Sequence, residues 1–129
     1  MAVMRQFAEN YASRNMTGVL SHFAPDNDLV LYATEADEKR IGLEGIKLQL
    51  ERDWSRTEAL SIEYDWTSIS SAGNVAWVAT DTIFKAKVQG HDLIFPFRST
   101  MVFEKRCDKW LIVHGHFSFP DEKINLWQF

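Results

Sequence analysis

The sequence predicts a single α+β domain over residues 1–129, in which three N-terminal helices pack on a strongly curved antiparallel sheet and enclose a pocket. Three observations support this prediction. The chain has 129 residues, the usual size of one domain. Its first part shows helical periodicity, and its second part shows four long runs of β-branched and aromatic residues. Helices followed by strands are typical of an α+β fold in which the helices cover one face of the sheet.

Helical spacing marks the N-terminal part of the chain. Residues 3–14 are expected to form an amphipathic helix, because its apolar side chains recur at i, i+3, i+4 and i+7: Met4, Phe7, Ala8 and Tyr11. Thr17 is a suitable N-cap for a short second helix, which residues 25–27 end with Pro-Asp-Asn. A third helix is expected over residues 42–55, with one face made of Leu43, Ile46, Leu50 and Trp54.

Strand patterns follow the helices. A short strand is expected over residues 28–33, after which the polar residues 34–40 turn the chain back. Beyond the third helix, turn-like segments separate four strands of an antiparallel meander: residues 61–70, 75–88, 93–105 and 110–119. The expected hairpin turns are residues 71–74, 89–92 and 106–108.

Counting outward from these turns places Asp81 opposite Thr100, and Thr100 opposite His114. One face of the sheet then mixes apolar and polar side chains: Tyr64, Trp66, Trp77, Ala79, Asp81, Ile83, Arg98, Thr100, Val102, Trp110, Ile112, His114, His116 and Ser118. We expect this mixed face to line the pocket under the helices. The other face is strongly apolar, and we expect it to form a homodimer contact through Phe97, Met101, Phe103 and Phe117. At the end of the chain, Trp127 and Phe129 are expected to dock on a neighbouring subunit.

The polar end of the mixed face is the candidate site. His116 is the expected catalytic acid or base, and Asp81 is expected to orient it. Arg98 offers a planar fork for a carboxylate or enolate oxygen. The expected ligand-binding residues are Arg98, His114, Thr100, Tyr32, Trp54, Tyr64, Trp66 and Trp77.

Two alternatives for these residues stay open. Asp81 and Arg98 can form a structural ion pair while the histidines are satisfied core residues. His114 and His116 point the same way on a strand, so with Asp81 they can supply three metal ligands. We nevertheless expect neither a metal nor a cofactor.

Composition excludes several classes of partner. The net charge is −4 and the basic residues are scattered, so no nucleic acid is expected to bind. No apolar run approaches the roughly 20 residues that span a bilayer, and no charged leader precedes an apolar stretch at the N-terminus. The single cysteine, Cys107, sits in a polar turn. A cytoplasmic protein without membrane contacts is therefore expected.

Two segments carry a resemblance to a known family. Phe97-Arg98-Ser99-Thr100 is followed by residues 110–118, which have the form Trp-x-x-x-His-x-His-x-Ser. With the helix start at residues 42–46, they resemble the SnoaL-like branch of the nuclear-transport-factor-two-like superfamily and the association domain of calcium/calmodulin-dependent kinase. The resemblance implies a cone-shaped roll of cystatin-like topology, a pocket between helices and sheet, and assembly into dimers or larger rings.

Members of this superfamily include isomerases, polyketide cyclases, dehydratases and non-catalytic adaptors, so the resemblance specifies fold more than function. It implies binding of a small, largely apolar ligand with an anionic or carbonyl group, together with acid/base chemistry. The alternative is a non-catalytic association module. Ketosteroid isomerase is similar over residues 14–18, but its catalytic positions fall at Phe7, near Ala33 and near Ser99, which lack the required groups. Its steroid chemistry is therefore not expected here.

Overall fold

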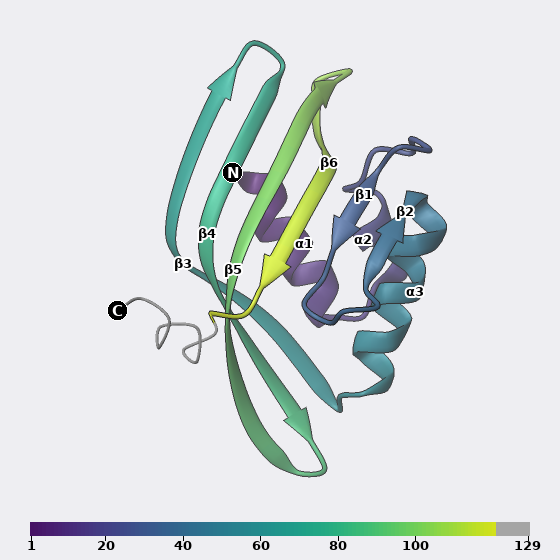
Figure 1. Ribbon diagram of the computed structural model, residues 1–129, viewed down its shortest axis with the longest axis vertical. Helices are drawn as coiled ribbons and strands as arrows, with labels where there is room; N and C mark the ends of the chain where they lie inside the picture. The colour runs from purple at the N-terminus through teal and green to yellow at the C-terminus, as the bar shows by residue number, and fades with distance from the viewer. Residues whose placement is uncertain (121–129) are drawn as a thin grey trace.

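The computed structural model describes residues 1–120 and confirms the α+β architecture (Figure 1). A curved six-stranded sheet has the strand order β2-β1-β6-β5-β4-β3, and the helices lie on one side of it. The helices are α1 (Ala2–Ala12), α2 (Met16–Leu20) and α3 (Gly42–Ser55). The strands are β1 (Val30–Tyr32), β2 (Lys39–Ile41), β3 (Ala59–Ala72), β4 (Val75–Val88), β5 (His91–Arg106) and β6 (Lys109–Ser118). Trp127 and Phe129 lie outside the described residues.

The helices follow the predicted pattern closely. On α1 the buried residues are Met4, Phe7 and Tyr11. The N-cap of α2 is Asn15 rather than Thr17, because the Asn15 side chain accepts a hydrogen bond from the backbone N–H of Gly18 at 3.0 Å. No helix within residues 1–120 has the length and hydropathy that crossing a bilayer requires.

The segment that was expected to be only a turn contains a strand. Lys39–Ile41 forms β2 and pairs antiparallel with β1, which in turn pairs parallel with β6. Three-residue strands leave little periodicity in a sequence, so tertiary pairing decides them. This small addition places residues 33–38, the loop between β1 and β2, beside the end of α3.

The β4–β5 register differs from the prediction by two residues. The turn consists of two residues, Gln89 and Gly90, both with left-handed backbone (φ 50° and 80°), and not of four. Asp81 therefore lies opposite Arg98 instead of Thr100. A shift of two preserves the face on which each side chain lies, because the side-chain period of a strand is two.

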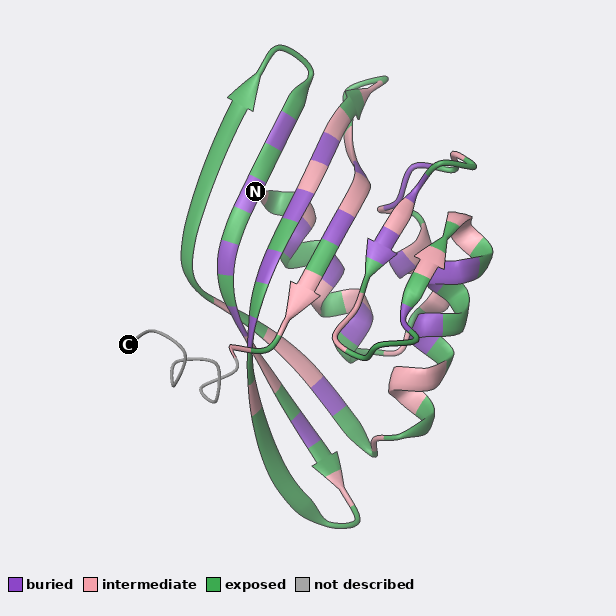
Figure 2. Cartoon of the chain, in the orientation of Figure 1, coloured by how far each residue is buried: buried purple, intermediate pink, exposed green. Residues whose placement is uncertain are grey.

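The face of the sheet that meets the helices is the reverse of the predicted one. Phe97, Met101 and Phe103 are 9%, 3% and 0% exposed and belong to the core, and Phe117 packs against it. They cannot form the homodimer contact that the sequence suggested. The apolar stripe of α1 must be buried against apolar side chains, and the strongly apolar face buries it better than the mixed face. Figure 2 shows the resulting alternation of buried and exposed residues along β4 and β5.

Two irregularities bend the sheet and move side chains between faces. In β6 the register shifts at Val113, so that Ile112 lies opposite Phe103 and is 1% exposed, whereas the prediction placed Ile112 on the same face as His114. In β3 a second shift follows Tyr64, and Trp66 beyond it is 62% exposed. Alternation alone cannot reveal such bulges.

Candidate functional site

The predicted polar site lies on the outer face of the sheet, away from the helices. Asp81, Arg98, Thr100 and His116 line a shallow recess there, and Trp66 forms part of its wall. The structure thus brings these five residues together but leaves them open to solvent. Their predicted position under the helices was wrong, for the same reason that the two faces are reversed.

The other predicted site residues are dispersed. His114 Nδ1 lies 2.8 Å from the Val30 carbonyl oxygen, and the Tyr32 ring contacts the rings of His114 and His116 on the outer face. Trp77 is also on the outer face and is 43% exposed. Residues 1–120 contain no group of three or more His, Cys, Asp or Glu side chains arranged to hold a metal ion, so the structure does not assemble the His114, His116 and Asp81 alternative.

Two predicted residues lie on the helix side, where they support the fold. The indole N–H of Trp54 donates to the Tyr11 carbonyl oxygen at 3.1 Å, which ties α3 to α1. The Tyr64 hydroxyl donates to the Met4 carbonyl oxygen at 3.1 Å, and burial raises the pKa of Tyr64. Neither residue lines the inner cavity.

The inner cavity lies between the helices and the concave face of the sheet and has a volume of about 330 Å³. That volume is within the range of small-molecule sites. Most of the wall is aromatic or aliphatic, with rings from both layers: Phe7, Tyr11, Phe23, Phe84, Phe95, Phe97, Phe117 and Phe119. Polar side chains gather at one end, from the β1–β2 loop, from α3 and from the two residues that follow α3: Thr34, Glu35, Glu38, Gln49, Asp53, Arg56 and Thr57.

Asp53 is the central polar group of this end. The Tyr11 hydroxyl donates to Asp53 Oδ2 at 2.7 Å, and Gln49 Nε2 donates to Asp53 Oδ1 at 2.9 Å. Burial raises the pKa of Asp53 and the charge of Glu38 adds to the rise, although the two hydrogen bonds oppose it. Asp53 therefore holds a proton more readily than an exposed aspartate does. Burial, followed by the charge of Asp53, raises the pKa of Tyr11 well above its usual value, so its phenol stays a donor.

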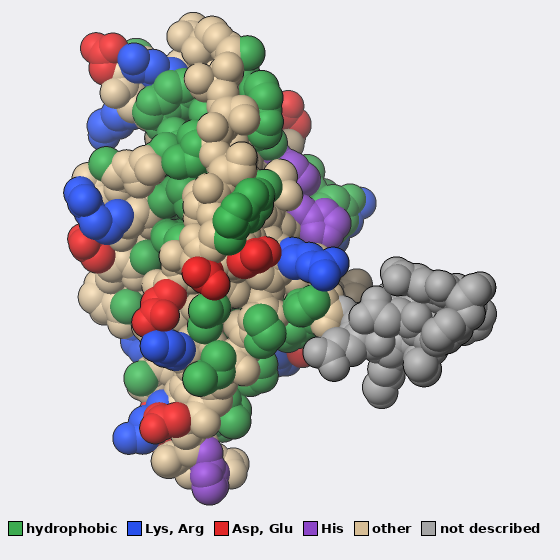
Figure 3. Space-filling view, turned by 90° about the vertical axis from the view of Figure 1, so that its left-hand side faces the viewer, with side chains coloured by type: hydrophobic (Ala, Val, Ile, Leu, Met, Phe, Trp, Pro, Cys, Tyr) green, Lys and Arg blue, Asp and Glu red, His purple; other side chains and the backbone are tan. Residues whose placement is uncertain are grey.

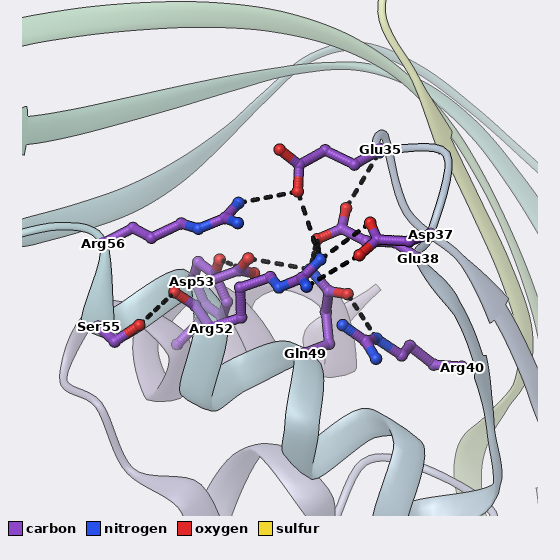
Figure 4. Close-up of polar contacts among 10 residues, drawn as sticks. Glu35, Asp37, Glu38, Arg40, Gln49, Arg52, Asp53, Ser55 and Arg56 are labelled. Carbon is purple, nitrogen blue, oxygen red and sulfur yellow. Dashed lines mark hydrogen bonds and ion pairs between the residues drawn. The ribbon is translucent and has the colours of Figure 1, made fainter.

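Glu38 is a second carboxylate at the same end, and it is 4% exposed. Burial by itself raises the pKa of Glu38, but hydrogen bonds from Gln49, the Glu35 backbone N–H and Arg52 together hold it below its ordinary value. The distances are 3.0 Å from Gln49, 3.0 Å from the Glu35 N–H and 3.3 Å from Arg52. Figure 4 shows these contacts converging from the β1–β2 loop and α3. One cavity end thus contains one carboxylate that resists protonation and one that favours it, a difference that acid/base sites use.

The sequence contained a signal for Asp53 that the prediction did not use. Ile46, Gln49, Leu50 and Asp53 follow the spacing i, i+3, i+4 and i+7, which places them on one helix face. Ile46, Gln49 and Leu50 are buried. A carboxylate on the same helix face as buried residues is expected to be buried too, and this pattern indicates a candidate acid inside the domain.

Comparison with known proteins identifies the family. The family model for the SnoaL-like domain matches residues 1–122. The chain belongs to the SnoaL-like domain family. No curated protein matches this SnoaL-like chain.

Solved structures agree on the fold of the SnoaL-like chain. A candidate calcium/calmodulin-dependent protein kinase II association domain from Xanthomonas campestris is 26% identical, with a TM-score of 0.84 over 94% of this chain and 85% of that one. A nuclear transport factor 2-like superfamily protein from Salmonella enterica is 19% identical, with a TM-score of 0.83 over 94% and 88%. A candidate scytalone dehydratase from Novosphingobium aromaticivorans is 12% identical, with a TM-score of 0.82 over 93% and 80%.

Proposed function

We propose that this SnoaL-like protein binds a small, largely apolar molecule in its inner cavity and transfers a proton to or from it through Asp53. The observation that supports the proposal is the position of Asp53, a buried carboxyl with a raised pKa that lines an otherwise mainly apolar cavity of about 330 Å³. A raised pKa makes the ionised carboxylate a stronger base and lets the neutral acid form persist long enough to return the proton. The mainly apolar wall offers water few hydrogen-bond partners, and a poorly hydrated site strengthens polar interactions with a bound ligand.

The ligand of this proposal carries a carbonyl or hydroxyl oxygen. The expectation of an anionic group rested on Arg98, which lies on the outer face. Beside a carbonyl group, ionised Asp53 removes a proton from the adjacent carbon. The Tyr11 hydroxyl, now 2.7 Å from Asp53 Oδ2, donates to the enolate oxygen once Asp53 has become neutral. Asp53 then returns the proton to a carbon of the enolate, and the net change is a shift or exchange of that proton.

The test uses β-tetralone, a bicyclic ketone with acidic protons beside its carbonyl. We expect it to raise the melting temperature of the wild-type chain and to exchange those protons for deuterium in D₂O faster than in buffer alone, as followed by NMR. In Asp53→Asn the protein-dependent exchange should fall at least about a hundredfold. Arg98→Met, which changes the outer recess, should leave both results unchanged.

The two parts of the proposal fail separately. Tight binding without accelerated exchange would leave a binding protein and refute the proton transfer. Absence of binding by a series of bicyclic ketones and alcohols would refute the small-molecule function itself.

A second function, self-association, is favoured by the outer face of the sheet. Trp66, Trp77 and Ile94 are 62%, 43% and 67% exposed there. Figure 3 shows hydrophobic side chains among polar ones on the side of the molecule where β3 is outermost. Among residues 1–120, no ion pair includes Asp81 or Arg98, although they lie opposite one another on β4 and β5. A two-fold axis through this face would pair Arg98 of each copy with Asp81 of the other.

We therefore propose a homodimer through the outer face, which replaces the predicted contact through Phe97, Met101, Phe103 and Phe117. Analytical ultracentrifugation at micromolar concentration should give a dimer, and Trp77→Glu should give a monomer. Leu48→Glu serves as the control, because Leu48 is 53% exposed on α3 and lies away from this face. A monomeric wild type, or a dimer that survives Trp77→Glu, would contradict the proposal.

A further inference from the structure

The cavity end that contains Asp53 also contains a buried fixed charge at Glu38. Both Glu38 oxygens are held by donors: Oε1 accepts from the Glu35 backbone N–H, and Oε2 accepts from Gln49 and Arg52. Glu38 lines the cavity, and only 4% of it is exposed to solvent. The carboxylate is therefore ionised and little screened by water.

Gln49 keeps this carboxylate in place because its amide has only one possible orientation. Arg40 Nε donates to Gln49 Oε1 at 3.0 Å, and an arginine side chain has no acceptor, so the amide oxygen must face Arg40. The NH₂ group must then face the two carboxylates, and it donates to Glu38 at 3.0 Å and to Asp53 at 2.9 Å. Figure 4 shows Gln49 between Arg40 and the acidic groups.

The positive charges near Glu38 do not offer a site for an anion inside the cavity. Arg52 is shared among Glu35, Asp37 and Glu38, and it is not part of the cavity wall. Among residues 1–120, Arg56 is the one basic residue in that wall, and it pairs with Glu35 at 2.8 Å. The acidic residues of the wall are Glu35, Glu38 and Asp53. The wall therefore presents carboxylates to a ligand. Of the basic residues that balance them, Arg52 lies outside the wall and Arg56 is already paired with Glu35.

We infer that Glu38, positioned by Gln49, is the residue that determines ligand charge: it excludes carboxylates and other anions and restricts the cavity to uncharged or cationic molecules. This inference rests on the proposed small-molecule function and deepens it by naming the ligand class. A like charge within a few ångströms in a poorly hydrated cavity disfavours an anion, whereas an alcohol or an ammonium group can donate to the carboxylate oxygens.

The test compares two molecules of nearly the same shape, naphthylmethanol and naphthoate, by isothermal titration calorimetry at neutral pH. The wild-type chain should bind the alcohol at least about tenfold more tightly than the carboxylate, the effect of one pKa unit of repulsion. Naphthylmethylamine, the matched cation, should bind at least as tightly as the alcohol. These comparisons use the wild-type chain alone and do not depend on the folding of any variant.

Glu38→Gln keeps the shape and removes the charge. It should reduce the ratio of the affinity for naphthylmethanol to the affinity for naphthoate by about tenfold, chiefly through tighter binding of naphthoate. Glu35→Gln is the matched control, because Glu35 is half-exposed and paired with Arg56. In this variant the ratio of the two affinities should change much less. The inference would be overturned if the wild-type chain bound naphthoate and naphthylmethanol equally well. It would also be overturned if folded Glu38→Gln kept the wild-type ratio of the two affinities. Either result would leave the binding function intact. Failure of all three probes to bind would instead count against the proposed function, and this inference would fall with it.

Discussion

Asp53 is a carboxyl group in a place where ionisation is costly. Burial raises its pKa in the folded chain, so the protonated form is favoured relative to the unfolded chain. Its contribution to stability is fully present below the unfolded pKa and is lost as the pH rises through the folded pKa. A destabilising acid in the wall of a cavity is typical of functional sites, where residues needed for activity often lower the stability of the fold.

The first prediction follows from the direction of this pKa shift. Asp53→Asn cannot ionise, so at pH 7 it should be more stable than the wild type, by about 1 kcal/mol, which is a usual size for the effect of one substitution. The difference should shrink as the pH is lowered through the folded-state pKa, because the wild-type carboxyl then becomes protonated. Urea unfolding at several pH values measures it. The exposed Asp92→Asn should change stability by less than about 0.5 kcal/mol, and a destabilised Asp53→Asn at pH 7 would contradict the assignment.

At the scale of elements, α3 decides the geometry of the site. It begins immediately after β2, at Gly42, whose φ of 69° suits glycine. One turn later, Gly45 lies against the backbone of Arg40, where an added Cβ would be 3.1 Å from the Arg40 carbonyl carbon. This close approach brings the Arg40 guanidinium within reach of Gln49 and so fixes the orientation of the amide.

The second prediction tests this packing. An alanine in a helix is usually favoured over glycine by about 1 kcal/mol, but at Gly45 the contact with backbone should outweigh that gain. We expect Gly45→Ala to lower the free energy of unfolding by about 1 kcal/mol, measured by urea unfolding, within the range of overpacking. Glu44→Ala, at an exposed neighbouring position, should have little effect. A stabilised Gly45→Ala would show that α3 can move from β2 without cost.

At the scale of the whole molecule, the side on which the helices pack separates core from outer surface. Phe103 is fully buried between sheet and helices, whereas Trp77 lies one strand away on the other face and is 43% exposed. The two residues therefore distinguish the observed arrangement from the reversed one.

The third prediction compares them directly. Phe103→Ala should cost about 3–5 kcal/mol of unfolding free energy, the usual loss for a deleted core aromatic. Trp77→Ala, studied at concentrations low enough for a monomer, should cost less than about 1 kcal/mol. Chemical denaturation of both variants measures the difference. Similar costs would mean that the packing face has been assigned wrongly.

The sequence by itself determined the three helices, the first strand and the four-strand meander, and their order, but not β2. The i, i+3, i+4 and i+7 stripe of Met4, Phe7 and Tyr11 predicted α1, and the long β-branched and aromatic runs predicted the four-strand meander, because these patterns are local. The segments around Arg98 and His116 predicted the SnoaL-like family, which the match over residues 1–122 shows.

Only the tertiary structure decided which face of the sheet is inside, and with it which residues form the cavity. Strand alternation separates two faces but does not say which of them the helices cover, and the two-residue turn at Gln89 and the bulge at Val113 change register and face without a clear sequence mark. Tyr11 and Asp53 are 42 positions apart in the chain and meet only because the tertiary fold brings the C-terminal ends of α1 and α3 together. Their hydrogen bond, and the charge balance around Glu38, depend on contacts between elements that local patterns do not encode.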